Sequence, residues 1–280
     1  MEYRIEDLDR LHRELVDILE EIIRVCDALH IDYFIQGGTA IGAYFNQGFV
    51  PWDDDIDLGM TRDNYARFIK EAPTVLKKGY FLQCFETEPD TPFYFCKIRK
   101  DNTLFVETPY KHLPIHHGIF VDIFPFDNVP DNPRMERIHR RLVQFWEGCF
   151  KKSLMKEALL EGMAKLPAPL AKGIAAIRFT FIRLLPRRFY YKALCATQSA
   201  FNKRSCKYVS IVKMPLDQIE KSTVTPPATM FFEGLTVKAP SNVLQYLKHH
   251  YPHLAPTLPK KLQVTHAPEV LRFDNPELYL

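Results

Sequence analysis

A chain of 280 residues has room for one large domain or two small ones. Hydrophobic residues make up 46% of it and charged residues 25%, close to the globular average, which excludes a disordered or fibrous protein. Its net charge of only +3 excludes a uniformly basic nucleic-acid-binding protein.

The apolar residues occur in short runs, none as long as the roughly 18 residues of a membrane-spanning helix. The N-terminal sequence MEYRIEDLDRLHREL is acidic and helical in character, unlike a secretory signal. We therefore expect a cytoplasmic protein, or one held peripherally on the inner face of the membrane. The six cysteines form no CxxC pair, which excludes zinc-finger spacing and favours buried, reduced thiols.

The small net charge conceals an uneven distribution. Residues 151–207 contain 8 Lys, 5 Arg and 2 Glu, a local charge of +11, so the remainder of the chain carries −8. Two electrostatic characters in one chain predict two kinds of partner.

The first seventy residues predict an alternation of helices and short strands. Apolar residues recur every three or four positions from Leu8 to Leu29, which predicts one long helix over 5–30 with its stripe in the core. The β-branched and aromatic residues of 31–35 predict a strand. After it we expect a helix at 39–46, a strand at 56–60, and a helix at 62–71 that is capped by Thr61 or Asp63 and ends before Pro73.

Beyond residue 80 the sequence is first rich in β-formers and then helical and basic. Runs at 80–86, 93–100 and 103–108 predict three strands, the last two joined by a tight turn at Asp101-Asn102. A fourth strand is expected at 118–127 and is predicted to stop at Pro125. From 131 to 207 we expect basic helices. The last seventy residues hold nine of the 21 prolines, which predicts extended chain around the core with one helix at 241–250.

Glycines and aspartates crowd into one short window. Five of the 11 glycines lie within 37–59, and the same window contains Asp53, Asp54, Asp55 and Asp57. Glycine allows the backbone to approach a ligand closely. Carboxylates this close repel one another, so a cation is needed to bring them together.

The strand predicted after this loop indicates how the carboxylates are arranged. Side chains two residues apart on a strand share a face, so Asp55 and Asp57 would lie about 7 Å apart on one side. Such a pair can hold Mg²⁺ together with phosphate oxygens, while backbone N–H groups after Gly37-Gly38 hold the phosphate itself. Asp122, in the middle of the apolar run GIFVDIFPF, is the candidate third carboxylate because a buried acid needs a partner.

Each part has a simpler interpretation when taken alone. A Gly-Gly pair marks a turn, a DxD pair ends a solvated strand, and Asp122 could pair with an arginine. Their occurrence together, in this order, favours a metal-dependent nucleotidyl-transfer site.

Several segments closely resemble the signature of the LicD family. Residues 33–60 read YFIQGGTAIGAYFNQGFVPWDDDIDLGM, similar to the family's GGT…GA element followed by its PWDDDID element. CKIRKDNTLFVE (96–107) resembles its K-V/I-R…T strand pair, and GIFVDIFPFDNVP (118–130) resembles its D-I/L-FP motif. FFEGLTVKAPSNVLQYLKHHY (231–251) resembles its late F-x-G…YL…Y segment, and HAPEV (266–270) its terminal His region.

The resemblance implies an α+β fold, with a nucleotidyltransferase-like mixed β-sheet core flanked by helices and a mostly helical basic insertion. On this basis we divide the chain into a catalytic core (1–130), a basic helical segment packed on the core (131–210), and a C-terminal part that wraps the same LicD-type domain (211–280).

The activity implied is Mg²⁺-dependent transfer of a phospho-alcohol from a CDP-activated donor to a sugar hydroxyl, with Mn²⁺ as a substitute metal. The first expectation is phosphocholine from CDP-choline, moved to a lipid-linked or free glycan of a teichoic acid, capsule or lipopolysaccharide. Carried over residue by residue, the catalytic and metal carboxylates are Asp55, Asp57 and Asp122. The donor-binding residues are Gly37, Gly38, Thr39, Lys97, Arg99 and Asp53.

Two positions depart from the family pattern, and one pair of residues is ambiguous. Gln36 precedes the Gly-Gly pair where an acidic or other polar residue is expected, and Tyr251-Pro252 replaces a late Tyr-Gly. The second departure bears on the acceptor side of the site. His116 and His117 are candidate second bases, although a surface pair in a loop explains them more simply.

Other interpretations remain open. The basic, aromatic stretch 172–194 fits peripheral membrane contact through an amphipathic helix, or a bundle whose basic residues face water or the donor. A ribitol- or glycerol-phosphate transferase would use the same motifs. A nucleotidyltransferase using an NTP would release pyrophosphate, and a non-catalytic accessory protein would have no need of three carboxylates. No nucleic-acid partner is expected.

Overall fold

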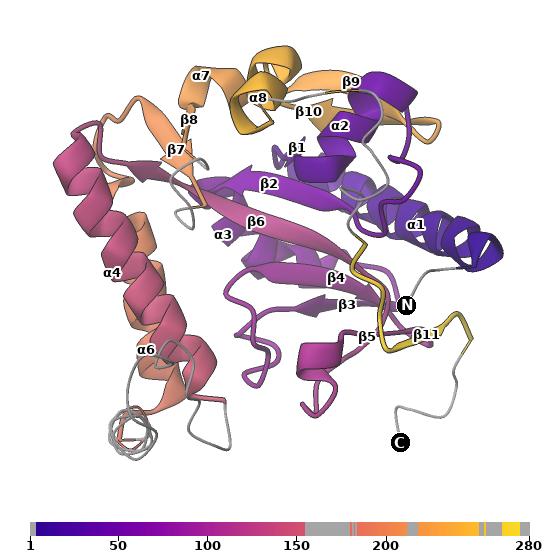
Figure 1. Ribbon diagram of the computed structural model, residues 1–280, viewed down its shortest axis with the longest axis horizontal. Coiled ribbons are helices and arrows are strands. Elements are labelled where there is room, and N and C mark those ends of the chain that lie inside the picture. The colour runs from indigo at the N-terminus through magenta and orange to yellow at the C-terminus, as the bar shows by residue number, and fades with distance from the viewer. Residues whose placement is uncertain are drawn as a thin grey trace.

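The computed structural model describes residues 4–154, 180, 182, 184–211, 218–251, 255 and 265–274. Within these residues, seven strands form one mixed sheet in the order β1-β2-β6-β4-β3, with β7 and β8 extending it from the end of β6 (Figure 1). Only β2 and β6 pair in parallel there. The strands are β1 (Phe34–Ile35), β2 (Asp57–Thr61), β3 (Tyr80–Gln83), β4 (Cys96–Lys100), β5 (Leu104–Val106), β6 (Phe120–Val129), β7 (Tyr208–Ser210), β8 (Ile219–Glu220), β9 (Ala228–Phe232), β10 (Leu235–Ala239) and β11 (Val270–Arg272).

Helices surround this sheet, which confirms the expected α+β class. The described helices are α1 (Ile5–Leu29), α2 (Gly37–Asn46), α3 (Arg62–Glu71), α4 (Pro133–Lys152), α6 (Arg187–Gln198), α7 (Lys221–Val224) and α8 (Val243–His250). The long first helix, the helix at 62–71 and the late helix at 241–250 form where the sequence predicted them. Among the described residues, no helix has both the length and the apolar character needed to cross a membrane.

One face of the sheet is apolar and packs against α1 and α3. Ile98 of β4 and Ile123 of β6 are fully buried on this face, as are the stripe residues of α1 from Leu11 to Val25. Lys100 also points this way and reaches Asp17 of α1 at 2.6 Å. Because strand side chains alternate, Lys97, Arg99 and Asp122 must project from the opposite face.

The predicted stop at Pro125 is wrong, because β6 continues through it to Val129. Asp122 N–H donates to Ile56 on the β2 side, so the nitrogen of Pro125, three residues later, faces the other edge. On that edge, pairing with β4 ends at Ile123 and pairing with β7 begins at Asp127. The missing N–H of proline therefore falls where β6 changes partners and no ladder bond is required.

The tight turn predicted at Asp101-Asn102 is confirmed, and Asn102 adopts a φ of 58°. The strands on either side of the turn do not pair with each other, because β4 pairs with β3 and β6 whereas β5 pairs with β11, more than 160 residues away in sequence. Tertiary contacts, rather than the turn, decide the partner of β5. The pairing of β5 with β11 also accounts for part of the extended C-terminal wrapping that the prolines predicted.

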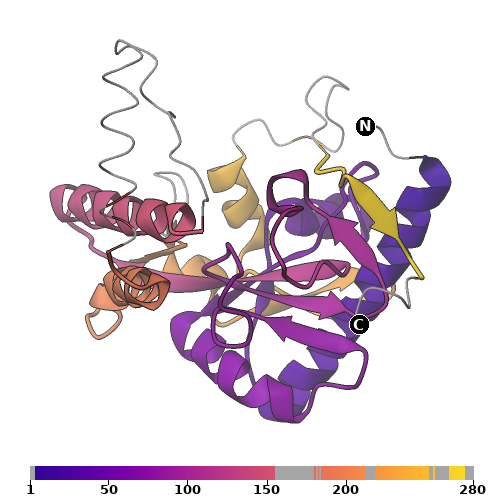
Figure 2. The ribbon, with the colours of Figure 1, turned by 90° about the horizontal axis from the view of Figure 1, so that it is seen from below.

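A second apolar cluster joins α4 and α6 to the loop after β3. Phe150 of α4 and Leu194 of α6 are fully buried in it, and Phe85 stacks on Tyr191 at 4.1 Å. The two helices lie side by side at the edge of the molecule, away from α1 (Figures 1 and 2). They confirm the helical character expected of 131–207 where that interval is described. Residues 155–179, 181 and 183 lie outside the described part.

An ion pair fastens α3 to the far end of β6. The guanidinium of Arg62 donates to both carboxylate oxygens of Asp127, which is fully buried, and Asn202 donates to the same carboxylate at 2.6 Å.

We predict that Asp127→Ala lowers the free energy of unfolding by about 3–5 kcal/mol, because it leaves the largely buried Arg62 without its partner. Urea denaturation measures this. Glu71→Ala, which breaks a more exposed pair with Arg67, should cost less than about 1 kcal/mol, and equal losses would contradict the assignment.

Candidate active site

The register of the sheet places four polar residues in one row. Asp57 of β2 lies opposite Asp122 of β6, Asp122 lies opposite Lys97 of β4, and Lys97 lies opposite Gln83 of β3. Residues directly opposite each other on neighbouring strands share a face. Two of the three predicted metal carboxylates therefore lie side by side, on the face that α1 and α3 leave uncovered.

The remaining aspartates arrive from the loop before β2. Asp53, Asp54 and Asp55 precede the strand, which begins at Asp57 rather than at the expected position 56. Asp54 is buried, whereas Asp53 and Asp55 are partly buried. The loop is held from the side by His12 of α1, which stacks on Phe49 at 3.8 Å and contacts the backbone oxygen of Asp53 at 2.8 Å.

Two glycines allow these carboxylates to sit against the start of α2. A Cβ added to Gly38 would lie 2.2 Å from Oδ2 of Asp53, and one added to Gly37 would lie 3.0 Å from Oδ2 of Asp57. Gly37 also has a φ of +59°, in the left-handed region that favours glycine. The Gly-Gly pair thus provides the close approach that its sequence predicted, although the observed neighbours are carboxylates.

The helix α2 begins at Gly37, two residues earlier than expected. Gln36 occupies its N-cap without a side-chain cap bond, because its amide donates to Leu58 O at 3.3 Å. Gly37 N–H donates to the hydroxyl of Tyr246 on α8 at 3.3 Å. Thr39 faces the strand, and its Oγ1 accepts a hydrogen bond from Asp57 N–H at 2.9 Å. The positive end of α2 therefore points at the carboxylate row.

Crowding and burial raise the pKa values of these acids. Burial is the main cause for each, and repulsion by neighbouring carboxylates adds to it for Asp53, Asp55 and Asp57. The pKa of Asp53 rises to about 8 and that of Asp55 to about 6, while that of Asp57 rises well above its ordinary value. Burial also raises the pKa of Asp122, with Lys97 opposing the shift.

Lys97 supplies the positive charge beside Asp122. Its Nζ lies 3.0 Å from Oδ1 of Asp122 and 3.6 Å from Oε2 of Glu107, and its side chain is almost entirely buried. The ring of Phe120 lies 3.4 Å from the same ammonium group. Lys97 is thus held against the carboxylate row by an ion pair and a cation–π contact.

Arg99 lies behind this pair and is completely buried. It donates to Gln83 Oε1 at 2.6 Å and to Gly118 O at 2.7 Å, and it lies 3.6 Å from Glu107. Its guanidinium is thus engaged within the protein. Contact between Arg99 and a donor diphosphate stays a prediction, whereas its support of the Lys97–Glu107 pair is visible.

Asp54 and His266, which are not among the predicted site residues, complete the acidic cluster. The backbone N–H of His266 donates to Asp54 Oδ2 at 2.8 Å, and its Nδ1 lies 3.5 Å from Asp54 and 3.7 Å from Asp55. Its hydrogen bond with Asp54 raises the pKa of His266 to about 9, so its imidazolium counters the acids at neutral pH. The only signal for His266 in the sequence was the HAPEV segment, which lies over 200 residues from the aspartates.

His116 and His117 are engaged elsewhere. His116 accepts the Gly118 N–H at Nδ1 and contacts Asp101 through Nε2 at 3.0 Å, so both ring nitrogens are occupied. Burial lowers its pKa to about 4. His117 contacts Leu113 O at 3.1 Å. These contacts are made with the loop residues Leu113 and Gly118 and with Asp101, which favours the simpler interpretation of a pair in a loop.

The donor set fits a hard divalent cation. Carboxylate oxygens are the preferred ligands of Mg²⁺, and Asp53 Oδ2 is buried with no hydrogen-bond partner among the described residues. Within the described part of the chain, Asp54, Asp55 and His266 form a group whose potential ligand atoms all lie within 4.8 Å of one another. Charge repulsion between Asp55 and both Asp57 and Asp122 shows that this group adjoins the carboxylate row.

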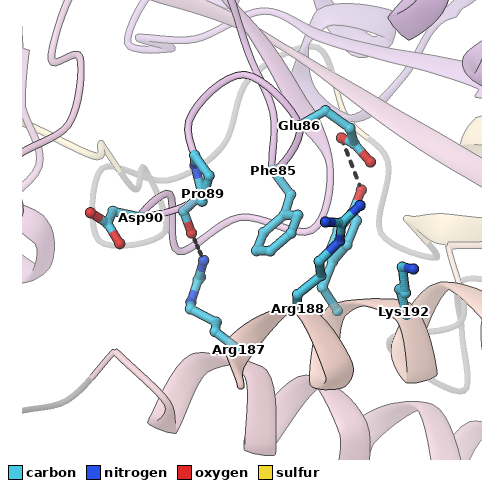
Figure 3. A pocket seen from close by; sticks show the side chains of 8 residues that line it. Phe85, Glu86, Pro89, Asp90, Arg187, Arg188 and Lys192 are labelled. Atoms are coloured by element: carbon cyan, nitrogen blue, oxygen red, sulfur yellow. Dashed lines mark hydrogen bonds between the residues drawn. The ribbon is translucent and has the colours of Figure 1, made fainter. Parts of the chain in front are cut away.

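A separate pocket of about 550 Å³ lies where α6 meets the loop after β3 (Figure 3). Arg188 and Lys192 extend from α6 toward Glu86, while Arg187 donates to the backbone oxygen of Pro89. None of the predicted site residues lines it. It is therefore a distinct feature of the α4–α6 side of the molecule.

Comparison with known proteins supports the resemblance seen in the sequence. The family model described as LicD/FKTN/FKRP, nucleotidyltransferase domain, matches residues 30–159. A lipopolysaccharide cholinephosphotransferase LicD of Haemophilus influenzae is 26% identical over 272 residues, which cover 90% of this chain and 92% of the relative. An uncharacterized protein of Rickettsia typhi is 31% identical over 81 residues, 29% of this chain and 26% of that protein.

The raised carboxylate pKa values predict how stability depends on pH. The folded chain holds more protons on Asp53 and Asp55 than the unfolded chain between about pH 4 and pH 8, so their contribution to stability is lost as the pH rises through that range. In EDTA, Asp53→Asn should flatten the fall in Tm between pH 5 and pH 8, measured by scanning calorimetry. Mg²⁺ should raise the Tm more at pH 8, because only ionised carboxylates bind it.

Asp9→Asn, an exposed change on α1, serves as the control and should keep the wild-type slope. If Asp53→Asn and wild-type proteins lose stability in parallel from pH 5 to pH 8, the crowding of Asp53 is not what the geometry indicates.

The glycine contacts predict a matched pair of substitutions. Gly38→Ala places a methyl group on the Asp53 carboxylate, so the carboxylate must move and the Mg²⁺-dependent rise in Tm should largely disappear. Gly148→Ala on α4 meets nothing within 4 Å and should raise the free energy of unfolding by about 0.5–1 kcal/mol without changing the Mg²⁺ effect. An undiminished Mg²⁺ effect in Gly38→Ala would show that Asp53 does not serve the metal site.

Proposed function

Because the chain belongs to the LicD family, we propose that it is a phosphotransferase that moves phosphocholine from CDP-choline to a hydroxyl of a cell-surface glycan and releases CMP. The observation that carries this proposal is the carboxylate row beside the Gly-Gly start of α2. The relative in Haemophilus influenzae, whose name gives lipopolysaccharide and choline phosphate, supports the choice of donor group and acceptor class.

We assign the metal to the carboxylates. Asp55, Asp57 and Asp122 hold Mg²⁺, or Mn²⁺ in its place, and Asp54 fixes the position of His266 beside them. When bound, the cation neutralises charge on the donor diphosphate as CMP departs. The unusual pKa values support this assignment, because a cluster whose acids resist ionisation together gains most from a divalent cation.

The donor phosphates are assigned to the start of α2. Gly37, Gly38 and Thr39 form the first turn of the helix, where the helix dipole favours an anion. Asp53, the remaining donor-binding residue, lies against Gly38 on the same side, so the donor-binding residues adjoin the metal carboxylates. Lys97 completes the arrangement by balancing the charge of Asp122.

The reaction then requires one substitution at phosphorus. The acceptor oxygen forms a bond to the distal phosphorus of the donor, the bond to the CMP oxygen breaks, and the hydroxyl proton passes to Asp122 or to solvent. Phosphoryl transfer of this kind depends on positioning and on charge stabilisation. Arg99 acts through Glu107, whose Oε2 lies 3.6 Å from both Arg99 and Lys97.

The membrane contact predicted for 172–194 falls partly outside the described residues, which do not include 172–179, 181 and 183. A cytoplasmic location likewise stays a prediction. Neither is required for the assignment of the carboxylate cluster.

The proposal predicts the outcome of three substitutions. Asp55→Asn, Asp57→Asn and Asp122→Asn should each lower CMP release from CDP-choline roughly 100-fold or more in the presence of Mg²⁺ and a lipopolysaccharide acceptor, because each removes charge that positions the metal. Circular dichroism checks that the fold is retained. Asp63→Asn, an exposed change on α3, should keep wild-type turnover. Near-native turnover in any of the three variants would remove that residue from the catalytic set.

The same assay distinguishes the donor. With CDP-choline, CDP-ribitol, CDP-glycerol and CTP tested in turn, we expect CDP-choline to give the largest Mg²⁺-dependent rise in Tm and CMP to be the product. Pyrophosphate release from CTP would identify a nucleotidyltransferase and overturn the proposal.

A further inference from the structure

The helix α4 has two apolar faces, of which only one is covered. Its inner face packs against α6 and the loop after β3 through Val143 and Phe150, which are 1% and 0% exposed. Its outer face carries four large apolar side chains that are 43–60% exposed: Met135, Ile138, Leu142 and Phe145. Their spacing of three, four and three residues places them on one side of the helix.

The exposed apolar surface continues from α4 onto α6. The ring of Trp146 lies 5.0 Å from that of Phe145 and 6.0 Å from that of Phe189 on α6, which is 44% exposed. Leu184 and Leu185, immediately before α6, are 68% and 44% exposed. We call the outer face of α4 together with Phe189 the docking face. It lies on helices at the edge of the molecule, on the side away from α1 (Figures 1 and 2).

Basic side chains flank this apolar face. At 100° per residue, Arg134, Arg137 and Arg141 occupy the neighbouring strip of α4, on the side away from the inner face. All three are exposed, and none makes an ion pair with another described residue. The acids of the helix are neutralised, since Glu136 pairs with Arg140 and Glu147 pairs with Lys151.

A helix with an apolar face and a basic strip beside it suits a partner that has an apolar interior and a negatively charged outer layer. Exposed apolar patches rimmed by polar residues mark interaction sites, and unpaired arginines beside such a patch favour a negatively charged partner. A second copy of the chain would bring the same arginines together, and like charges oppose that contact. We propose that the docking face binds an anionic lipid surface, with α4 lying in the plane of the headgroups.

Docking of this kind has a use if the proposed function holds, because a lipid-carried glycan would then reach the enzyme at the surface on which it is bound. The lipid contact itself does not depend on that function. It concerns residues 134–145 and 189, outside the carboxylate cluster and within the described part of the chain.

The test is co-sedimentation of the full chain with vesicles. Vesicles of phosphatidylglycerol and phosphatidylcholine should bind most of the protein at low salt, and binding should fall at least tenfold with pure phosphatidylcholine or in 0.5 M NaCl, which screens charge. The triple change Ile138→Ser, Leu142→Ser and Phe145→Ser should lower binding at least tenfold. So should Arg134→Gln with Arg137→Gln and Arg141→Gln. All of these side chains are exposed, so circular dichroism should show an unchanged fold.

Phe231→Ser provides the matched control, because Phe231 is 62% exposed and belongs to β9, a strand that lies away from α4 (Figure 1). It should bind vesicles like the wild type. No binding to anionic vesicles at low salt, or wild-type binding by both multiple variants, would overturn the proposal. So would a dimer, seen by ultracentrifugation, that the serine variant abolishes. Vesicle binding without CMP release would refute the proposed function and leave the docking face standing.

Discussion

Mutual repulsion among buried carboxylates is the constraint on which the rest of the structure depends. Asp57 and Asp122 face each other across a parallel strand pair, and Asp53 and Asp55 approach from the preceding loop. A fold can hold such a group only where positive charge is close and backbone can come near without a side chain in the way. Lys97, His266 and the start of α2 provide these conditions from three distant parts of the chain.

This constraint accounts for the position of Lys97 and Asp122 on the sheet face opposite to the hydrophobic layer under α1 and α3. On β4 and β6, every second side chain points toward α1 and α3, and Ile98 and Ile123 are buried there. The side chains in between bring Lys97 and Asp122 together. The hydrophobic layer therefore sets the register, and a slip of one residue would turn Lys97 and Asp122 into the core. Core packing and the arrangement of the acidic cluster are thus specified by the same strand pairings.

Much of the fold and of the acidic cluster could be predicted from local sequence. Features that depend on contacts between distant segments could not. The stripe of α1, the helix at 62–71 and the DDDID run are signals within a single segment. The predicted stop at Pro125 failed, and the partner of β5 could not be predicted, because partner choice for β6 and β5 is decided by distant segments. His266 escaped assignment for the same reason, since its hydrogen bond to Asp54 spans more than 200 residues.

The exchange of partners along β6 joins two parts of the sheet through one continuous strand. On one edge its first residues pair with β4 and its last with β7, while β2 pairs along the other edge as far as Phe126. Pro125 is buried and falls between the two ladders, where no N–H is required. The residue that local rules treat as a strand breaker therefore marks the point at which the strand that carries Asp122 passes from the central strands to the β7–β8 extension.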